Sequence, residues 1–117
     1  MTETSARVII TAVVESFVKQ TLLYDFYGCL LTERQREIYE AYALENYSLA
    51  EIADGLHISR QAVYDNIKRC NSLLEEYEEK LALVSKFVEI KEELSGIENC
   101  TDLEEARSRA KKIRQML

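Results

Sequence analysis

Proline is absent from the 117 residues of this chain, and glycine occurs only three times, at Gly28, Gly55 and Gly96. Proline breaks helix interiors and glycine weakens them, so a chain nearly free of both can run in long helices. An all-β chain would need many turn residues, which are missing here. The composition therefore predicts an all-α fold, and the length suits a single all-helical domain over residues 1–117.

The cysteines Cys29, Cys70 and Cys100 lie far apart and are odd in number. Without a CxxC motif or a Cys/His cluster, we expect no zinc or other metal site, no disulfide framework and no cofactor. We interpret the three as small buried or half-buried apolar residues, and free thiols suit a cytoplasmic location.

The apolar run Val8–Val14 is shorter than the ~20 residues of a membrane span. We therefore expect a buried helix face there, and no membrane insertion.

Helix starts are marked by capping residues. Reciprocal capping boxes pair Thr32 with Gln35, Ser48 with Glu51 and Thr101 with Glu104, and Ser59 is an N-cap candidate without such a partner. The predicted helices cover about residues 5–27, 33–44, 49–56, 60 to beyond 74, and 102–116. The stretch 82–97 either extends the fourth helix or forms a fifth.

The segment Ser48–Cys70 predicts a helix-turn-helix, within a core of about residues 32–72. Ala53 is small and lets the second helix approach closely, and Gly55 and His57 flank Leu56 where the chain must turn. Six apolar side chains are expected to close this unit: Ile52, Ala53, Leu56, Ile58, Val63 and Ile67.

The opposite face of the second helix carries the candidate nucleic-acid-binding residues Arg60, Gln61, Tyr64, Lys68 and Arg69. In a DNA-reading helix-turn-helix the early residues of this helix enter the major groove. Arginine suits guanine and glutamine suits adenine, while Lys68 and Arg69 would meet phosphates. Against this, Asp65 lies on the same face, and the net charge of −6 opposes indiscriminate adhesion to nucleic acid. Two interpretations stay open: contact with nucleic acid, or the solvated surface of a scaffold or protein-contact unit.

An apolar seam with alternating spacings of four and three residues predicts a long helix with coiled-coil character. It comprises Val63, Ile67, Cys70, Leu74, Tyr77, Leu81, Val84 and Val88. A second stripe comprises Leu83, Phe87, Ile90, Leu94 and Ile97. Residues of about 73–117 would then form a helical extension that makes a homodimer through Tyr77, Leu81, Val84, Phe87 and Val88. The alternative is a monomeric bundle, in which the first helix (Val14, Phe17, Val18) and the last helix cover the stripes.

Five basic residues lie in the last predicted helix: Arg107, Arg109, Lys111, Lys112 and Arg114. They either bind phosphate or an acidic partner, or form a solvated face that complements the helix dipole.

No residue pattern indicates an enzyme. His57 is the only histidine, and the chain has no Gly-rich phosphate loop and no GxSxG motif. We therefore expect no catalytic residues.

The sequence LTERQREIYEAYALENYSLAEIADGLHISRQAVYDNIKRC resembles the promoter-reading helix-turn-helix of sigma factors and the LuxR-type domain. Together with LLYDFYGCLLTERQ before it and LLEEYEEKLALVSKF after it, it more closely resembles the YlxM-type family of small bacterial helix-turn-helix proteins, over roughly Leu22–Phe87. The resemblance implies a sigma region 4-like helix-turn-helix in a small helical bundle with a long C-terminal helical extension.

Proteins of that family are often encoded beside the GTPase of the signal recognition particle and are described as regulators of its pathway. The resemblance thus implies an accessory of that pathway that binds RNA or DNA, the particle GTPase, or both. One alternative is a sequence-specific DNA-binding transcription regulator unrelated to protein targeting. A second is a protein-interaction scaffold without nucleic-acid binding.

Overall fold

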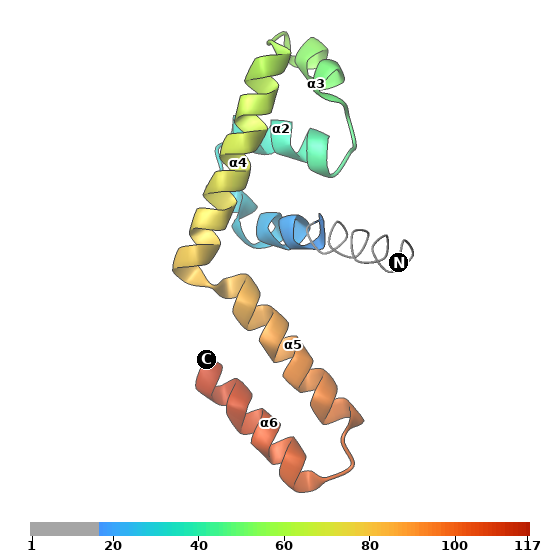
Figure 1. Cartoon of the computed structure of the whole chain (residues 1–117), viewed down its shortest axis with the longest axis vertical. Helices are drawn as coiled ribbons and strands as arrows, with labels where there is room; N and C mark the ends of the chain where they lie inside the picture. The colour runs from blue at the N-terminus through green and yellow to red at the C-terminus, as the bar shows by residue number, and fades with distance from the viewer. Residues whose placement is uncertain (1–16) are drawn as a thin grey trace, which may run out of the picture. The chain divides into compact units, whose positions relative to one another are not determined.

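The computed structural model describes residues 17–117, which form helices and short connections with no strand among them (Figure 1). The all-α prediction is confirmed. Residues 17–27 are helical, in agreement with the C-terminal part of the predicted first helix; residues 5–16, with the run Val8–Val14, lie outside the described range. The other elements are η1 (Gly28–Leu30), α2 (Glu33–Ala43), α3 (Leu49–Leu56), α4 (Arg60–Leu81), α5 (Leu83–Asn99) and α6 (Leu103–Met116).

The chain falls into two compact units, unit 1 up to Lys80 and unit 2 over Leu81–Leu117. The expected division near residue 72 lies inside α4, which continues without interruption to Leu81. Within unit 1, the helix over 17–27, α2 and α3 lie on the same side of α4 (Figure 1). Unit 1 therefore contains the predicted helix-turn-helix together with the helices that support it.

Local capping fixes where most helices begin. At both Thr32 and Ser48 the side-chain oxygen accepts a hydrogen bond from the third backbone N–H of the helix, and the reciprocal bond is also formed. The Ser59 hydroxyl oxygen accepts from the backbone N–H of Ala62 at 3.0 Å. These three predictions are confirmed. The Thr101 capping box is wrong, because the Asp102 carboxylate accepts from Glu104 and caps α6 instead.

The core of the helix-turn-helix consists of the six predicted residues together with Ile38, Ala41 and Leu49. Ile52, Ala53, Val63 and Ile67 are buried, and Leu56 and Ile58 pack against them. Ile38 of α2 is only 1% exposed and completes the cluster. α2 thus closes the open side of the two-helix unit and is part of the same fold.

The turn between α3 and α4 depends on His57 and not on Gly55. His57 adopts a left-handed conformation (φ 57°, ψ 42°), and its backbone N–H donates to the carbonyl of Ala53. The Ile58 N–H donates to the same carbonyl at 3.1 Å. Gly55 lies inside α3 without a positive φ. The chain therefore reverses two residues later than the glycine suggests.

The C-terminal half of α4 packs against the helix over 17–27. Tyr27 is 1% exposed and Leu74 is fully buried. The Tyr27 ring lies 6.1 Å from the ring of Tyr77, and its hydroxyl donates to Glu78 at 2.5 Å. Burial of one large aromatic side chain and one leucine contributes roughly 1.5–3 kcal/mol each. α4 is therefore held in unit 1 along most of its length.

The apolar seam is not carried by one continuous helix. The sequence leaves open whether residues 82–97 extend the fourth helix or form a fifth, and the structure shows the separate helix. α4 ends at Leu81, and α5 starts after Ala82, which is left-handed (φ 53°, ψ 30°). Alanine is the strongest helix former, so nothing in the sequence marks this break. The seam therefore runs over two helices.

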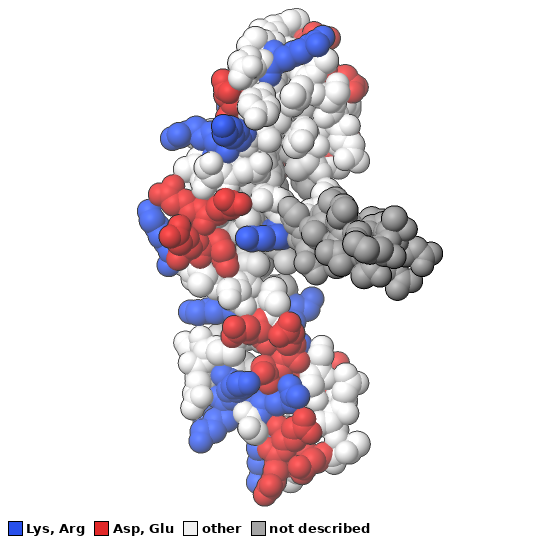
Figure 2. Space-filling view, viewed as in Figure 1, with Lys and Arg blue, Asp and Glu red and all other residues white. Residues whose placement is uncertain are grey.

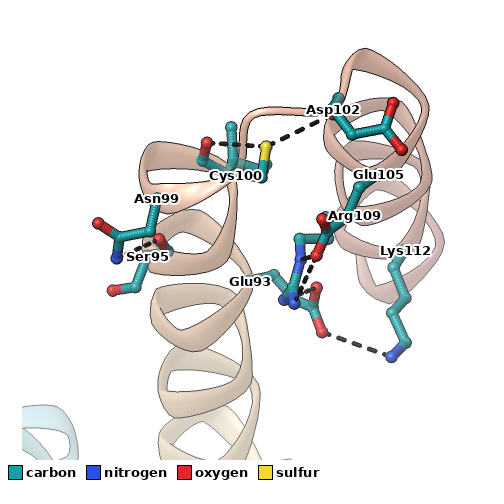
Figure 3. Close-up of polar contacts among 9 residues, drawn as sticks. Glu93, Ser95, Asn99, Cys100, Asp102, Glu105, Arg109 and Lys112 are labelled. Atoms are coloured by element: carbon teal, nitrogen blue, oxygen red, sulfur yellow. Dashed lines mark hydrogen bonds and ion pairs between the residues drawn. The ribbon is translucent and has the colours of Figure 1, made fainter.

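Unit 2 is a hairpin in which α5 and α6 pack together (Figure 1). Arg109 of α6 reaches Glu93 of α5 and Glu105 of its own helix, at 3.3 Å from each, and Lys112 lies 3.4 Å from Glu93 (Figure 3). A Cβ at Gly96 would clash with the guanidinium of Arg109. The missing side chain at Gly96 thus makes room for this arginine. Among the described helices, none is long and apolar enough to cross a membrane.

Candidate nucleic-acid interface

The five predicted contact residues all lie on the surface of α4: Arg60, Gln61, Tyr64, Lys68 and Arg69 are exposed. Their placement follows from helix periodicity, because Val63 and Ile67 occupy the face that is buried in the core. The Tyr64 side chain is 49% exposed. The structure thus brings the predicted set together on one open surface, which we call the α4 face.

The charge of α4 changes along its length. Its first ten residues carry Arg60, Lys68 and Arg69 against Asp65, whereas its last twelve carry Lys80 against four glutamates. Figure 2 shows this division, with Lys and Arg toward the N-terminal part of α4 and a dense acidic group further along. An anionic backbone would be attracted only to the N-terminal half.

Ion pairs also distinguish the basic residues in the N-terminal half of α4 from other basic residues of the protein. Arg34 pairs with Glu37 at 3.4 Å and Lys80 with Glu76 at 3.1 Å. Arg60, Lys68 and Arg69 form no ion pair with any described carboxylate. These three cations are therefore available to an external anion without breaking an internal pair.

Asp65 does more than reduce the positive charge of the face. Its carboxylate accepts a hydrogen bond from the Gln61 side-chain amide at 2.9 Å. This bond uses one of the two amide N–H groups and leaves the second N–H and the carbonyl oxygen of Gln61 accessible. Asp65 thus orients the Gln61 side chain and places one negative charge in the middle of the face. Beside it, Asp65, Lys68, Arg69 and Glu76 line a small hollow of about 280 Å³.

The predicted dimer residues lie in different surroundings. The Tyr77 ring packs against Tyr27 inside unit 1, and Val84 of α5 is 7% exposed. Leu81, Phe87 and Val88 are 48%, 39% and 38% exposed. A homodimer through them stays a prediction. Phe17 and Val18, offered as covering residues, are themselves 60% and 49% exposed, and Val14 lies outside the described residues.

The basic residues of α6 divide into two groups that their sequence alone does not separate. Arg109 and Lys112 are bound to glutamates (Figure 3). Arg107, Lys111 and Arg114 are exposed and form no ion pair with a described carboxylate. At spacings of four and three residues, these three share one helix face. The prediction of a wholly solvated or wholly ligand-binding tail is therefore too coarse.

The cysteines follow the expectation at two positions of three. Cys70 is fully buried, and burial raises the pKa of its thiol. Cys100 is intermediate, but Cys29 is exposed. No group of three or more His, Cys, Asp or Glu side chains that could hold a metal ion occurs in the part of the chain that the structure describes.

Sequence reasoning missed a cluster of tyrosines in unit 1. Tyr24 and Tyr39 stack with ring centroids 5.2 Å apart, and both are nearly buried. The Tyr24 hydroxyl donates to Glu40, and burial raises the pKa of both phenols, that of Tyr39 to about 12. The sequence does contain an indication of this cluster, because five of the seven tyrosines fall between residues 24 and 47.

Comparison with known proteins identifies the fold family. Residues 14–116 match a family model described as "Putative helix-turn-helix protein, YlxM / p13 like". A UPF0122 protein of Caldanaerobacter subterraneus subsp. tengcongensis is 55% identical over 86 residues, 74% of each chain. A UPF0122 protein of Thermoanaerobacter sp. (strain X514) is 48% identical over 103 residues, 88% of each chain. One of Halalkalibacterium halodurans is 49% identical over 85 residues, 73% of this chain and 78% of the relative. With its buried helix-turn-helix core and these matches, the chain belongs to the UPF0122 family of YlxM/p13-like helix-turn-helix proteins.

Proposed function

We propose that the protein is a regulatory module that binds duplex nucleic acid through the α4 face. The observation that supports this most directly is the combination of position and charge. Arg60, Lys68 and Arg69 are exposed on the second helix of a helix-turn-helix, and none is neutralised by a described carboxylate. In this motif the second helix is the one that enters the major groove.

Each residue of the face has a role that follows from its place on the helix. Arg60 and Gln61 are the first two residues of α4 and would meet base edges, guanine and adenine respectively. Lys68 and Arg69 lie two turns further along and would contact phosphates. Two phosphate contacts predict a modest salt dependence, with a slope of log K against log salt of about −1.8.

Selection from a random pool of duplex DNA, followed by salt titration of the enriched sequences, tests this function. We expect sequence preference, and we expect the double variant Arg60→Ala plus Lys68→Ala to lose binding at least tenfold, because a bidentate base contact alone contributes about 1–3 kcal/mol. Arg34→Ala plus Lys80→Ala is the matched control. It removes the same charge, but from residues that are already paired with Glu37 and Glu76. Equal effects of the two double variants would refute a specific α4 face.

We further propose that this module acts in the signal recognition particle pathway, on its RNA or its GTPase. Support comes from the family, whose YlxM members the sequence resembles. A pull-down of the tagged full chain from native lysate, with and without nuclease, distinguishes the alternatives. Recovery of the particle RNA or GTPase supports the pathway. Recovery of chromosomal DNA alone favours an unrelated transcription regulator. A partner set that nuclease and the α4 variants leave unchanged favours a protein scaffold.

We also propose that two copies associate through the exposed apolar residues Leu81, Phe87 and Val88, together with Tyr77 and Val84. A dimer would present two α4 faces to a symmetric site. Light scattering on the eluted peak should give twice the chain mass of 13.6 kDa at micromolar concentration. The variant Phe87→Glu should halve that mass. A 13.6 kDa species for the unmodified chain would refute the dimer.

A further inference from the structure

Unit 1 contains a hollow of about 690 Å³ that the α4 face does not use. The helix over 17–27, the end of α2, the loop between α2 and α3, and Asn71 of α4 form its walls. Tyr24 and Tyr39 are its most buried aromatic residues, at 9% and 3% exposure. Tyr42 and Tyr47 are nearly half exposed, at 45% and 47%. Aromatic rings thus occur both deep in the hollow and at its opening, and its volume is typical of small-molecule sites.

The described residues that line this hollow are uncharged, since lysine, arginine, aspartate and glutamate are absent from them. A charged ligand would lose its hydration here without meeting an opposite charge. Aromatic walls favour a flat ring that can stack against them. The chemistry of the lining therefore selects an uncharged planar molecule.

Amide groups give the hollow a hydrogen-bonding edge. The Tyr39 hydroxyl lies 2.9 Å from Asn71 Oδ1 and 3.3 Å from Gln20 Oε1. One hydroxyl proton satisfies one of these oxygens at a time, so the other oxygen can accept from a ligand. The side-chain NH₂ groups of Gln20 and Asn71 donate to no described residue. Donors and an acceptor thus stand side by side next to the stacked tyrosines.

We propose that this hollow binds an uncharged planar heteroaromatic ring of the nucleobase type, as a free base or nucleoside. Such a ring stacks on tyrosine through its face and pairs with amides through its polar edge. The ligand would touch the loop that leads into α3 and one residue of α4, so its binding would stabilise the helix-turn-helix. This site is independent of nucleic-acid contact by the α4 face.

Titration of the ¹⁵N-labelled full chain with adenosine, uridine and adenosine 5′-monophosphate tests the proposal by NMR. We expect at least one nucleoside to shift the backbone amides of Asn46, Tyr47 and Asn71. Because no cation occurs among the described residues of the lining, the monophosphate should bind more weakly than adenosine. Asn71→Leu should weaken nucleoside binding about 3- to 10-fold, the effect of one neutral hydrogen bond. Tyr64→Ala on the α4 face is the control and should leave affinity unchanged.

Failure of both nucleosides to shift these amides at millimolar concentration would overturn the proposal. So would an unchanged affinity in Ala43→Trp, which places a large ring into the hollow, or a monophosphate that binds as tightly as adenosine. Thermal melts of each variant establish that it is folded. Loss of DNA binding in the α4 variants with nucleoside binding intact would show that the two sites are separate.

Discussion

Replacement of Gly55 by alanine should stabilise the protein, although Gly55 adjoins the turn of the helix-turn-helix. Gly55 is the second-last residue of α3, two residues before His57, and a Cβ built there would meet nothing within 4 Å. In a helix interior glycine is about 0.8–1.0 kcal/mol less favourable than alanine. Because α3 ends one residue later, at Leu56, we expect part of this difference, about 0.5–1 kcal/mol.

Thermal unfolding followed by circular dichroism measures this effect. For a unit of 60–100 residues, 1 kcal/mol corresponds to about 4–8 °C, so the melting temperature of Gly55→Ala should rise by about 2–8 °C. His57→Gly should also stabilise, because φ at His57 is 57° and glycine adopts this conformation without the steric cost. A fall of more than 2 °C for Gly55→Ala would show that the turn begins at residue 55 and that α3 ends earlier.

Three further outcomes follow from the same contacts. Ser48→Ala should lower stability by about 1 kcal/mol in urea unfolding, since it removes a capping bond at α3, and Ser48→Asp should restore it. Burial raises the pKa of Tyr39 from 10 to about 12, so the unfolded chain ionises first as pH rises. The stability that this group contributes is complete below pH 10 and is lost between pH 10 and 12, by at most about 1.4 kcal/mol per pH unit. Tyr39→Phe should make the profile shallower, and Tyr24, whose pKa burial also raises, should account for the remaining slope. A thiol reagent should modify exposed Cys29 in the native protein but reach buried Cys70 only after unfolding.

Local sequence rules predicted the part of the fold that depends on neighbouring residues. The caps at Thr32, Ser48 and Ser59 and the inward positions Ala53 and Val63 follow from spacings of three and four residues, and the structure confirms them. The exposure of the α4 face follows from the same periodicity.

The remaining features depend on competition or on distant contacts. Asp102 stands next to Thr101, and both can cap a helix, so spacing alone cannot choose between them. The break at Ala82 opposes the intrinsic preference of alanine. The tyrosine-lined hollow joins residues 17–47 to Asn71, and the role of Arg109 depends on Glu93 in another helix. Such pairings arise only when the chain has folded.

The length of α4 has a consequence for affinity. One helix carries the exposed cations near its start, while Tyr27 binds its far half through a ring contact and a hydrogen bond to Glu78. In the proposed complex with nucleic acid these cations would stand on a preorganised helix, and little backbone conformational entropy would be lost on docking. Substitutions at Tyr27, which lies far from the proposed phosphate contacts, should accordingly weaken nucleic-acid binding because α4 becomes more flexible.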